Sequence, residues 1–379
     1  MTSKYGWEHK VESWDDKLNP NFMTLPQLLK NQNITTAFIC AHYSIPETIS
    51  NRINTDWSFY KDYLSEINET NRNKFYRIND ASRVTKDVKN WLRENSRQHF
   101  FLWIHFMDPH APYRAPQPYN KMYINDIYYK GDVKVKLIKK ETWNASGGMP
   151  LYMQLDNNDI LDYYISQYDG EINFVDANIG EMISYLKELN LQQKTAIIIT
   201  ADHGECLGDH SYYGHDRLLY DTLIKVPLIT VFPWIKNKKD KVTSLVETID
   251  IAPTILNLLG INNCPDFDGE SLLPLITNQK THRNKKCALC STGQGVKSFA
   301  LRTDKWKLTY NKTDNTYKLY YSIDGPNESN NLIYQESLEF KKLKIQLNCL
   351  LNKSFSHTKE NAQLDKKNKE LLRSLGYVQ

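Results

Sequence analysis

The fold of this chain is decided by the stretch AIIITADHGECLGDHSYYGHD, residues 196–216. It opens with four apolar residues and continues with seven His, Asp and Glu side chains. A short apolar run before a polar segment is typical of a buried strand that ends in a loop. In an α/β sheet, ligands bind beyond the carboxyl ends of the strands. The stretch therefore predicts a buried strand over 195–200 and a functional loop behind it.

A second run, FFLWIHF at 100–106, is apolar on both faces, which is typical of a strand covered on two sides in a parallel sheet. Apolar residues recur every three or four positions from 165 to 186, as in a helix with one buried face. The other predicted elements are helices over 82–95 and 250–260 and strands at the end of 24–42 and over 226–232. This alternation predicts an α/β fold, with a mostly parallel sheet that carries helices on both faces.

The sequence pattern changes at about residue 284. FALRTDKWKLTYN and TYKLYYSID alternate as exposed antiparallel strands do, and a charged helix follows them. We therefore predict an α/β domain over 1–283 and a small α+β subdomain over 284–379. Residues 114–160 are rich in tyrosine and irregular in pattern, and we predict that they form a surface insertion.

Charge and composition exclude several classes of protein. The formal net charge is only +4, with 48 basic against 44 acidic residues, so nothing indicates a nucleic-acid partner. No apolar run is long enough to span a bilayer, and the first residues lack the layout of a signal peptide. Six cysteines include one close pair, Cys287 and Cys290, whose spacing suits a zinc site, a disulfide or unpaired thiols.

Asp202 and His203 follow the strand predicted over 195–200. Neighbours inside a strand point to opposite faces, so they can address one ion only where the strand stops and the chain turns. Gly204 permits such a turn. The pair is compatible with half of a metal site, and equally with a helix-capping aspartate beside a hydrogen-bonded histidine.

Three further histidines are candidates for contact with a substrate. His110 stands between Pro109 and Pro112, which stiffen the backbone around it. A rigidly held imidazole suits an anion contact or proton delivery to a leaving group, or is simply satisfied within the turn. His210 and His215 follow in the polar loop, and either can face a substrate. A serine hydrolase is not indicated, because the sequence has no G-x-S-x-G motif.

Four stretches occur in a specific order: FLWIHFMDPHAPY (101–113), YDGEINFVDANIGEMI (168–183), TADHGECLGDHSYYGHD (200–216) and ALRTDKWKLTYN (300–311). Together they resemble the sulfatase family. The resemblance covers most of the chain outside 114–160 and 43–80. It implies an alkaline-phosphatase-like fold and hydrolysis of sulfate esters, with a sulfated small molecule or a sulfated glycan as substrate. It also implies a periplasmic or secreted protein.

The resemblance implies roles for particular residues of this sequence. Asp202 and His203 match a pair of metal ligands, and the ion in the family is usually calcium. His110 matches the histidine that contacts the sulfate and assists the leaving oxygen. His215 matches a Lys or His that binds a sulfate oxygen. His42 lies where other members place substrate-binding residues, and we add His210 as a further substrate-binding candidate.

The sequence also departs from the family pattern. Sulfatases attack with a formylglycine made from the Cys or Ser of a C-x-P-x-R-type motif, and no such motif is present. The nearest approach, SIPET at 44–48, has Thr48 where Arg is required. Two further metal-binding aspartates of the family's first strand are also missing. We therefore expect a chain that lacks the nucleophile segment, cannot carry formylglycine and does not hydrolyse sulfate esters by itself.

Two other functions remain open on the sequence. A phosphodiester or phosphonate ester hydrolase, or a head-group transferase, of the same superfamily shares the DHG and DPH elements. A non-catalytic protein that binds sulfate or glycan would explain the missing nucleophile.

Overall fold

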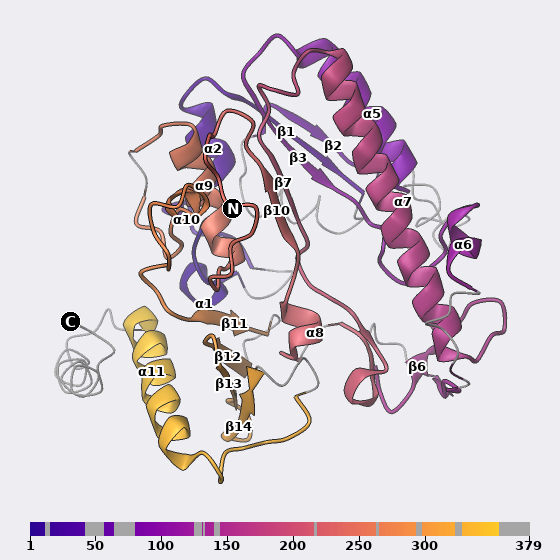
Figure 1. Ribbon diagram of the computed structural model, residues 1–379, viewed down its shortest axis with the longest axis vertical. Helices are drawn as coiled ribbons and strands as arrows, with labels where there is room; N and C mark the ends of the chain where they lie inside the picture. The colour runs from indigo at the N-terminus through magenta and orange to yellow at the C-terminus, as the bar shows by residue number, and fades with distance from the viewer. Residues whose placement is uncertain are drawn as a thin grey trace. The chain divides into compact units, whose positions relative to one another are not determined.

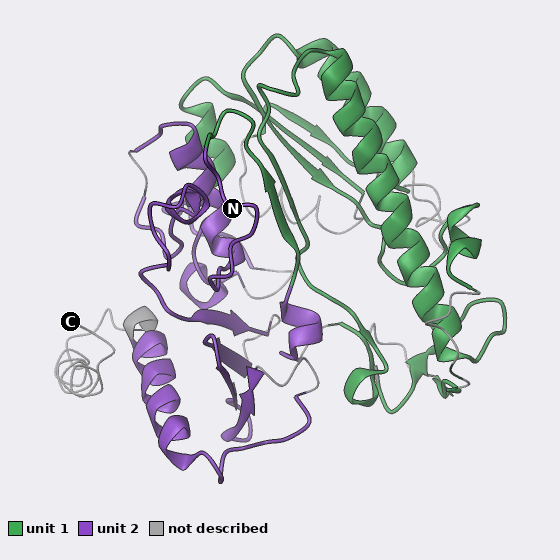
Figure 2. Cartoon of the chain, in the orientation of Figure 1, with its two compact units in different colours: residues 1, 23–216, 226–236 green, residues 2–22, 217–225, 237–379 purple. Residues whose placement is uncertain are grey.

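The computed structural model describes residues 1–11, 16–41, 57–63, 80–124, 131, 133–139, 145–215, 218–262, 265–292, 298–322 and 328–355. The chain forms two compact units (Figures 1 and 2). Unit 1 comprises residues 1, 23–216 and 226–236, and unit 2 comprises 2–22, 217–225 and 237–379. The units alternate along the chain, and the division at residue 284, which rests on sequence texture, stays a prediction.

A parallel sheet lies at the centre of unit 1. Strand β1 (Thr35–Cys40) pairs in parallel with β2 (Phe59–Lys61) on one side and with β3 (Phe100–His105) on the other. β1 is enclosed in the core, and its residues Ala37 to Cys40 have no exposed surface. The predicted strands at the end of 24–42 and at 100–106, and their parallel arrangement, are confirmed.

Two long helices pack on this sheet. Helix α5 (Ala81–Asn95) begins at Asp80, whose carboxylate accepts a hydrogen bond from the Arg83 amide, as an N-cap residue does. Helix α7 (Leu161–Glu188) lies beside α5 (Figure 1). The apolar faces of both helices join the sheet in one core, which includes Ala37, Ile39, Val84, Val88, Trp91, Leu92, Met182 and Leu186. Both helices were predicted, and both are confirmed.

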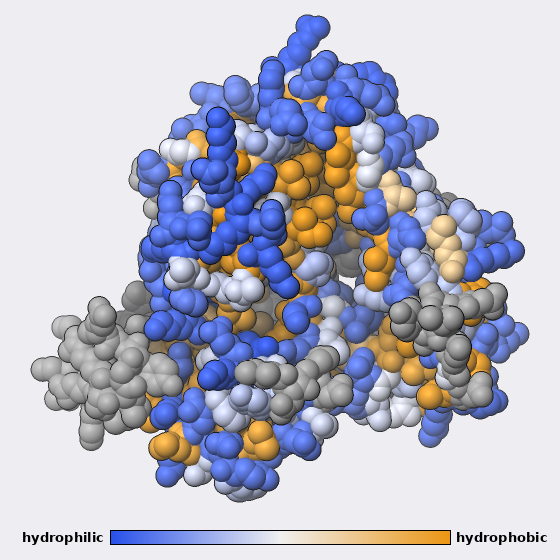
Figure 3. All heavy atoms as spheres, viewed as in Figure 1, coloured by the Kyte–Doolittle hydropathy of each residue, from blue (hydrophilic) through white to orange (hydrophobic). Residues whose placement is uncertain are grey.

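The strand predicted over 195–200 is present, and its pairing is the antiparallel exception in a mostly parallel prediction. β7 (Ile197–Thr200) pairs antiparallel with β10 (Leu228–Val231), and among the described residues these two strands do not pair with the sheet that holds β3. Both β3 and β7 are only half-buried, because each pairs along one edge among the described residues. On β10, Ile229 is 54% exposed, and Figure 3 shows apolar surface over this part of unit 1.

The loop after β7 folds back as a short hairpin. β8 (Cys206–Leu207) and β9 (Tyr212–Gly214) are antiparallel, with Cys206 opposite Gly214. Between them lies the 3-10 turn η4 (Asp209–Ser211). Gly208 precedes this turn and has a φ of 98°, a backbone conformation that favours glycine. The outer edge of β9 pairs with β5 (Ala145–Ser146).

The described part of 114–160 is less irregular than predicted. It contains α6 (Tyr119–Met122), β4 (Leu137–Ile138), β5, β6 (Met149–Pro150) and η3 (Leu151–Met153). Met149 and Met153 are fully buried in a cluster with Tyr113 and Tyr164. Part of the predicted surface insertion is therefore core, since its apolar residues pack under the first turns of α7.

Unit 2 is built around an antiparallel sheet, as the alternating pattern of its sequence predicts. Four strands pair in chain order, and α11 (Ser337–Phe355) packs on them through Leu343 and Leu347. The strands are β11 (Ala288–Ser291), β12 (Ser298–Arg302), β13 (Trp306–Asn311) and β14 (Thr316–Tyr321). The remaining elements are α1 (Gly6–His9), α2 (Leu25–Lys30, in unit 1), α8 (Asp221–Ile224), η5 (Thr248–Asp250), α9 (Ile251–Leu258) and α10 (Leu273–Ile276). Among the residues described, no helix is long and apolar enough to cross a membrane.

Candidate active site

Three histidine rings meet in unit 1. The ring centroids of His203 and His215 are 4.0 Å apart with the rings stacked, and His110 meets His215 edge-on at 5.0 Å. His110 follows β3, His203 follows β7, and His215 ends the β8–β9 hairpin. Side chains that are far apart in the sequence are thus brought together by the ends of two strands and a hairpin.

The hairpin also places a carboxylate beneath this cluster. With Cys206 opposite Gly214, the next pair outward is Glu205 and His215. The two carboxylate oxygens of Glu205 lie 3.3 and 3.4 Å from His215 Nδ1. The Glu205 side chain is only 5% exposed and that of His215 is 17% exposed. Glu205 is not recognisable as a site residue from the sequence, because its position next to His215 depends on how the hairpin folds.

Backbone carbonyls orient the other two rings. His110 Nδ1 lies 2.7 Å from the Ala111 oxygen, and His203 Nδ1 lies 2.8 Å from the Gly204 oxygen. A carbonyl oxygen can only accept a hydrogen bond, so Nδ1 carries the proton in each ring. In the neutral rings, Nε2 is therefore the nitrogen with the lone pair.

Burial sets the protonation state of His110. Burial, and then the nearby His215, lower the pKa of His110 to about 4, against the opposing effects of the Ala111 carbonyl and Glu205. At neutral pH and before an anion binds, His110 is uncharged.

Asp202 lies beside His203, with 3.7 Å between Asp202 Oδ2 and His203 Nε2. Desolvation by the surrounding protein would raise the pKa of Asp202, but His203 and His105 outweigh it, and the pKa is lowered. Burial lowers the pKa of His105 at the end of β3. Asp202 therefore carries a negative charge at neutral pH.

The described residues do not make up a calcium site. Asp202 and His203 offer one carboxylate and one imidazole nitrogen, whereas calcium prefers six to eight oxygen ligands. In the ranges that the structure describes, no group of three or more His, Cys, Asp or Glu side chains could hold a metal ion.

Two buried carboxyl groups support the loop that carries His110. Asp108 accepts a hydrogen bond from the Ala81 amide at 2.8 Å, which ties the loop to the start of α5. Burial, reinforced by Asp80, raises the pKa of Asp108 to about 7. Glu171 on α7 accepts a hydrogen bond from the Arg114 amide, and burial raises its pKa well above the usual value. The sequence indicates such a role for Glu171, because a glutamate on the apolar face of a helix is unusual, but Glu171 is not among the predicted site residues.

The other predicted positions have different outcomes. His42 lies outside the described residues. His210 is exposed in η4, where its φ is 54°. Cys287 and Cys290 are free thiols, so neither a disulfide nor, within the described chain, a metal cluster forms there. The functional roles of His110, His215, Asp202, His203 and His210 stay predictions.

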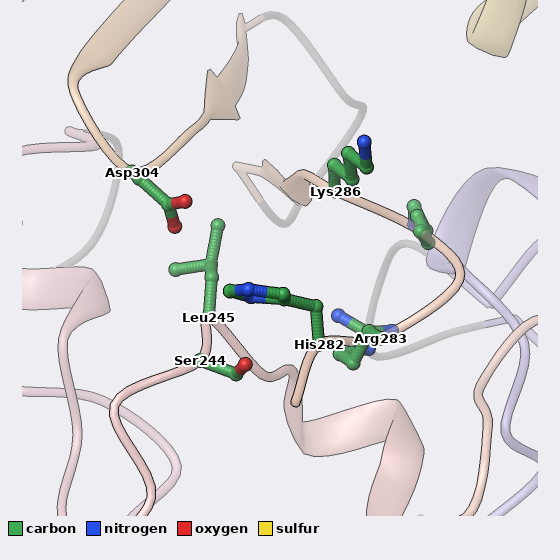
Figure 4. Close-up of a pocket in the computed structure, with 7 residues that line it drawn as sticks. Ser244, Leu245, His282, Arg283, Lys286 and Asp304 are labelled. Atoms are coloured by element: carbon green, nitrogen blue, oxygen red, sulfur yellow. The ribbon is translucent and has the colours of Figure 1, made fainter. Parts of the chain in front are cut away.

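Unit 2 has a separate surface pocket of about 220 Å³. Its lining residues are Ser244, Leu245, His282, Arg283, Lys285, Lys286 and Asp304. Figure 4 shows the His282 ring pointing toward Leu245, and Lys286 turned away from it.

The buried cations of this pocket are already paired with carboxylates. Arg283 contacts Glu247 at 3.0 Å, Asp250 at 2.9 Å and Glu270 at 3.1 Å. Lys285 contacts Glu247 at 3.0 Å. Because these carboxylates offset the positive charge, the pocket is a weaker candidate for anion binding than the histidine cluster of unit 1.

Comparisons with known proteins agree with these motifs. The family model described as Sulfatase matches residues 1–261, and the one described as N-sulphoglucosamine sulphohydrolase, C-terminal, matches 208–356. Arylsulfatase K of Gallus gallus is 26% identical over 404 residues, covering 96% of this chain and 74% of that protein.

Two solved structures share the fold. One, described as a complex with its substrate D-glucosamine-2-N,6-O-disulfate, has a TM-score of 0.68 at 20% identity and covers 96% of this chain and 88% of the other. The phosphonate monoester hydrolase from Silicibacter pomeroyi has a TM-score of 0.72 at 20% identity, with 94% and 85% covered.

Proposed function

The chain belongs to the sulfatase family, and from this premise we propose that the cluster of His110, His203 and His215 binds the sulfate group of a sulfate ester. The observation that carries the proposal is the meeting of these three rings, with Glu205 beneath them, in unit 1. They come from the two motifs that most closely resemble the family, DPHAPY and DHGECLGDHSYYGH.

We propose a sulfated sugar as the substrate class, with aryl sulfates as small surrogate substrates. A relative in fold is described with D-glucosamine-2-N,6-O-disulfate as its substrate. In this chain, the imidazole groups of the histidine cluster would recognise the tetrahedral sulfate anion of such a sugar.

We propose that His215 donates a hydrogen bond to a sulfate oxygen and that His110 serves the leaving oxygen. His110 is uncharged before binding, because its pKa is about 4. A sulfate anion beside the ring favours the protonated form, since an opposite charge stabilises a cation. His110 would thus acquire its proton in the complex and could then deliver it to the leaving alcohol.

We propose that Asp202 and His203 are two ligands of a divalent cation, as the family resemblance implies. When bound, such an ion would stabilise negative charge on the sulfate oxygens. The remaining ligands are not among the described residues.

We further propose that this chain, as its sequence stands, binds sulfate esters without hydrolysing them. A covalent nucleophile divides a difficult displacement into two easier steps. No Cys or Ser of this sequence stands in the motif that formylglycine formation requires. The clustered histidines suit anion and leaving-group roles and are not arranged to replace that nucleophile.

The test measures binding and turnover separately. Calorimetry with glucosamine 6-sulfate should detect binding that His215→Ala weakens about tenfold, the scale of one charge-assisted hydrogen bond. The control is His282→Ala, which changes an exposed histidine of unit 2 and should leave binding unchanged. Failure of the purified protein to bind the sulfated sugar would refute the proposal. Turnover of an aryl sulfate that His110→Ala abolishes would refute the claim that the chain does not hydrolyse sulfate esters.

A phosphonate ester hydrolase is the second candidate, favoured by the fold shared with the Silicibacter pomeroyi enzyme. Sulfate and phosphonate monoesters both present a tetrahedral anion. Competition with a phenyl phosphonate monoester in the same calorimetric assay distinguishes them, and tighter binding of the phosphonate would favour this candidate.

A further inference from the structure

Glu205 is placed to control the ring of His215. Its carboxylate is almost fully buried, and both of its oxygens face His215 Nδ1 at 3.3 and 3.4 Å. The β8–β9 register pairs Cys206 with Gly214, and Glu205 and His215 are the next residues along the two chain segments. The contact therefore follows from the backbone of the hairpin and does not depend on a flexible surface side chain.

A carboxylate facing Nδ1 determines which nitrogen of His215 can serve a ligand. Ionised carboxylates only accept hydrogen bonds, so Nδ1 must be the donor in this contact. Nε2 is then the ring nitrogen that can address a substrate. When Nε2 also carries a proton and donates to an anion, the ring is a cation, and the Glu205 carboxylate offsets its charge.

We infer that Glu205 is a positioning residue for anion binding: it holds His215 through Nδ1 and directs Nε2 toward the sulfate group. The inference rests on the proposed function in that it takes His215 to contact the anion. In functional histidines generally, a hydrogen-bond partner at one ring nitrogen fixes the orientation of the ring and the nitrogen that faces the ligand.

The surroundings of the pair support this role. Titratable groups close to Glu205 and His215 among the described residues include His203, His110, Tyr113, which also interacts with Glu205, and Tyr168. The Tyr212 hydroxyl donates to the His215 backbone oxygen at 3.3 Å. Burial, and then the charge of Glu205, raise the pKa of Tyr113, so this phenol stays neutral. Of the groups that these contacts bring to Glu205, His215 is the one whose nitrogen faces the carboxylate within 3.5 Å.

The test compares Glu205→Gln, which keeps the size of the side chain but removes its charge, with Asp209→Asn, which neutralises an exposed carboxylate of the same hairpin. Ring-nitrogen NMR of histidine-labelled protein reports the proton position on His215 without any ligand. Calorimetry with inorganic sulfate reports the affinity. We expect Glu205→Gln to shift the His215 nitrogen signals and to weaken sulfate binding about tenfold, whereas Asp209→Asn leaves both unchanged.

A double-mutant cycle separates positioning from a general loss of structure. If Glu205 acts through His215, Glu205→Gln should have no further effect on sulfate affinity in the His215→Ala background. Glu205→Asp should restore part of the affinity, because it returns the charge.

The outcomes are distinct. Unchanged His215 nitrogen signals in Glu205→Gln would overturn the inference, as would an equal loss of affinity in both backgrounds. If the wild type binds neither sulfate nor a sulfated sugar while the nitrogen signals do shift, the proposed function fails and the positioning of His215 by Glu205 stands.

Discussion

Asp108, two residues before His110, shows how strongly burial can set the chemistry of one side chain. Its pKa is raised to about 7, first by desolvation and then by Asp80, while the Ala81 amide partly opposes the shift. Because the carboxyl group also ties the loop after β3 to the start of α5, its ionisation affects both stability and the position of His110. The same principle explains the low pKa of His110, where burial disfavours the charged form of a base.

The first prediction concerns the pH dependence of folding. The folded-state pKa of Asp108 lies above the unfolded value, so the folded protein binds the proton more tightly. Stability from this group is therefore complete at low pH, falls as pH rises from about 4 to about 7, and is constant above that range. Asp108→Asn should flatten this part of the stability curve and raise stability at pH 8 by about 1–3 kcal/mol. Urea unfolding from pH 4 to 8 tests this, and a curve as steep as that of the wild type would contradict it.

At the scale of elements, short connections decide where the functional side chains lie. The β8–β9 hairpin turns through Gly208, whose φ of 98° is unfavourable for residues with a Cβ. A Cβ at this position would also lie 3.2 Å from Leu161 Cδ2 on α7. In unit 2, an ion pair links β13 to α8. Lys307 of β13 is 1% exposed and contacts Asp221 of α8 at 2.9 Å and Glu328 at 2.6 Å.

The second prediction concerns that turn. Gly208→Ala should destabilise the protein by about 1–2 kcal/mol, since alanine strains a left-handed backbone position. It should also weaken sulfate binding by displacing His215. Gly180→Ala is the matched control: it lies within α7 with no atom near the new Cβ, and it should stabilise the helix by about 0.5–1 kcal/mol. Chemical denaturation and sulfate calorimetry on both variants test the prediction. Equal effects of the two substitutions would contradict it.

The third prediction concerns the buried ion pairs of unit 2. Lys307→Met leaves the buried Glu328 without its cation and Asp221 with Arg302 alone, which should cost about 3–5 kcal/mol of unfolding free energy. Lys305→Met, at an exposed position in the turn before β13, should cost less than about 0.5 kcal/mol. Thermal and urea unfolding measure both, and a loss below 1 kcal/mol for Lys307→Met would show that the pair contributes little.

At the scale of the whole molecule, the chain has the fold of a sulfatase, and we propose that it binds sulfate esters without hydrolysing them. The three histidine rings and Asp202 gather in unit 1, but the sequence supplies no motif for formylglycine. Loss of one catalytic group commonly lowers the rate of an enzyme by a factor of about 10² or more, which is why we propose binding without turnover. The most direct consequence concerns the metal ion.

The fourth prediction is that this chain binds calcium weakly or not at all. The described residues supply one carboxylate and one imidazole at this site, well short of the oxygen ligands that calcium requires. Calorimetric titration with calcium chloride should show no saturable heat at micromolar concentrations, and Asp202→Asn should behave like the wild type. Tight binding that Asp202→Asn abolishes would mean that the chain supplies further ligands.

The sequence by itself determined the elements and the family. The periodic apolar residues of α7, the apolar runs of β3 and β7 and the alternating strands of unit 2 are local patterns, and burial imposes them on any chain of this fold. His110, Asp202 and His203 could be placed at strand ends for the same reason. Only the tertiary structure decided which side chains meet. Glu205 faces His215 because of a hairpin register, and His110 loses its charge because of burial. β7 pairs antiparallel with β10, and β3 pairs in parallel with β1, because of contacts between distant segments. The burial of His110 and the pairing of the strands depend on contacts between residues far apart in the sequence, and the Glu205 contact depends on how one hairpin turns. The spacing of neighbouring residues gives no information about either.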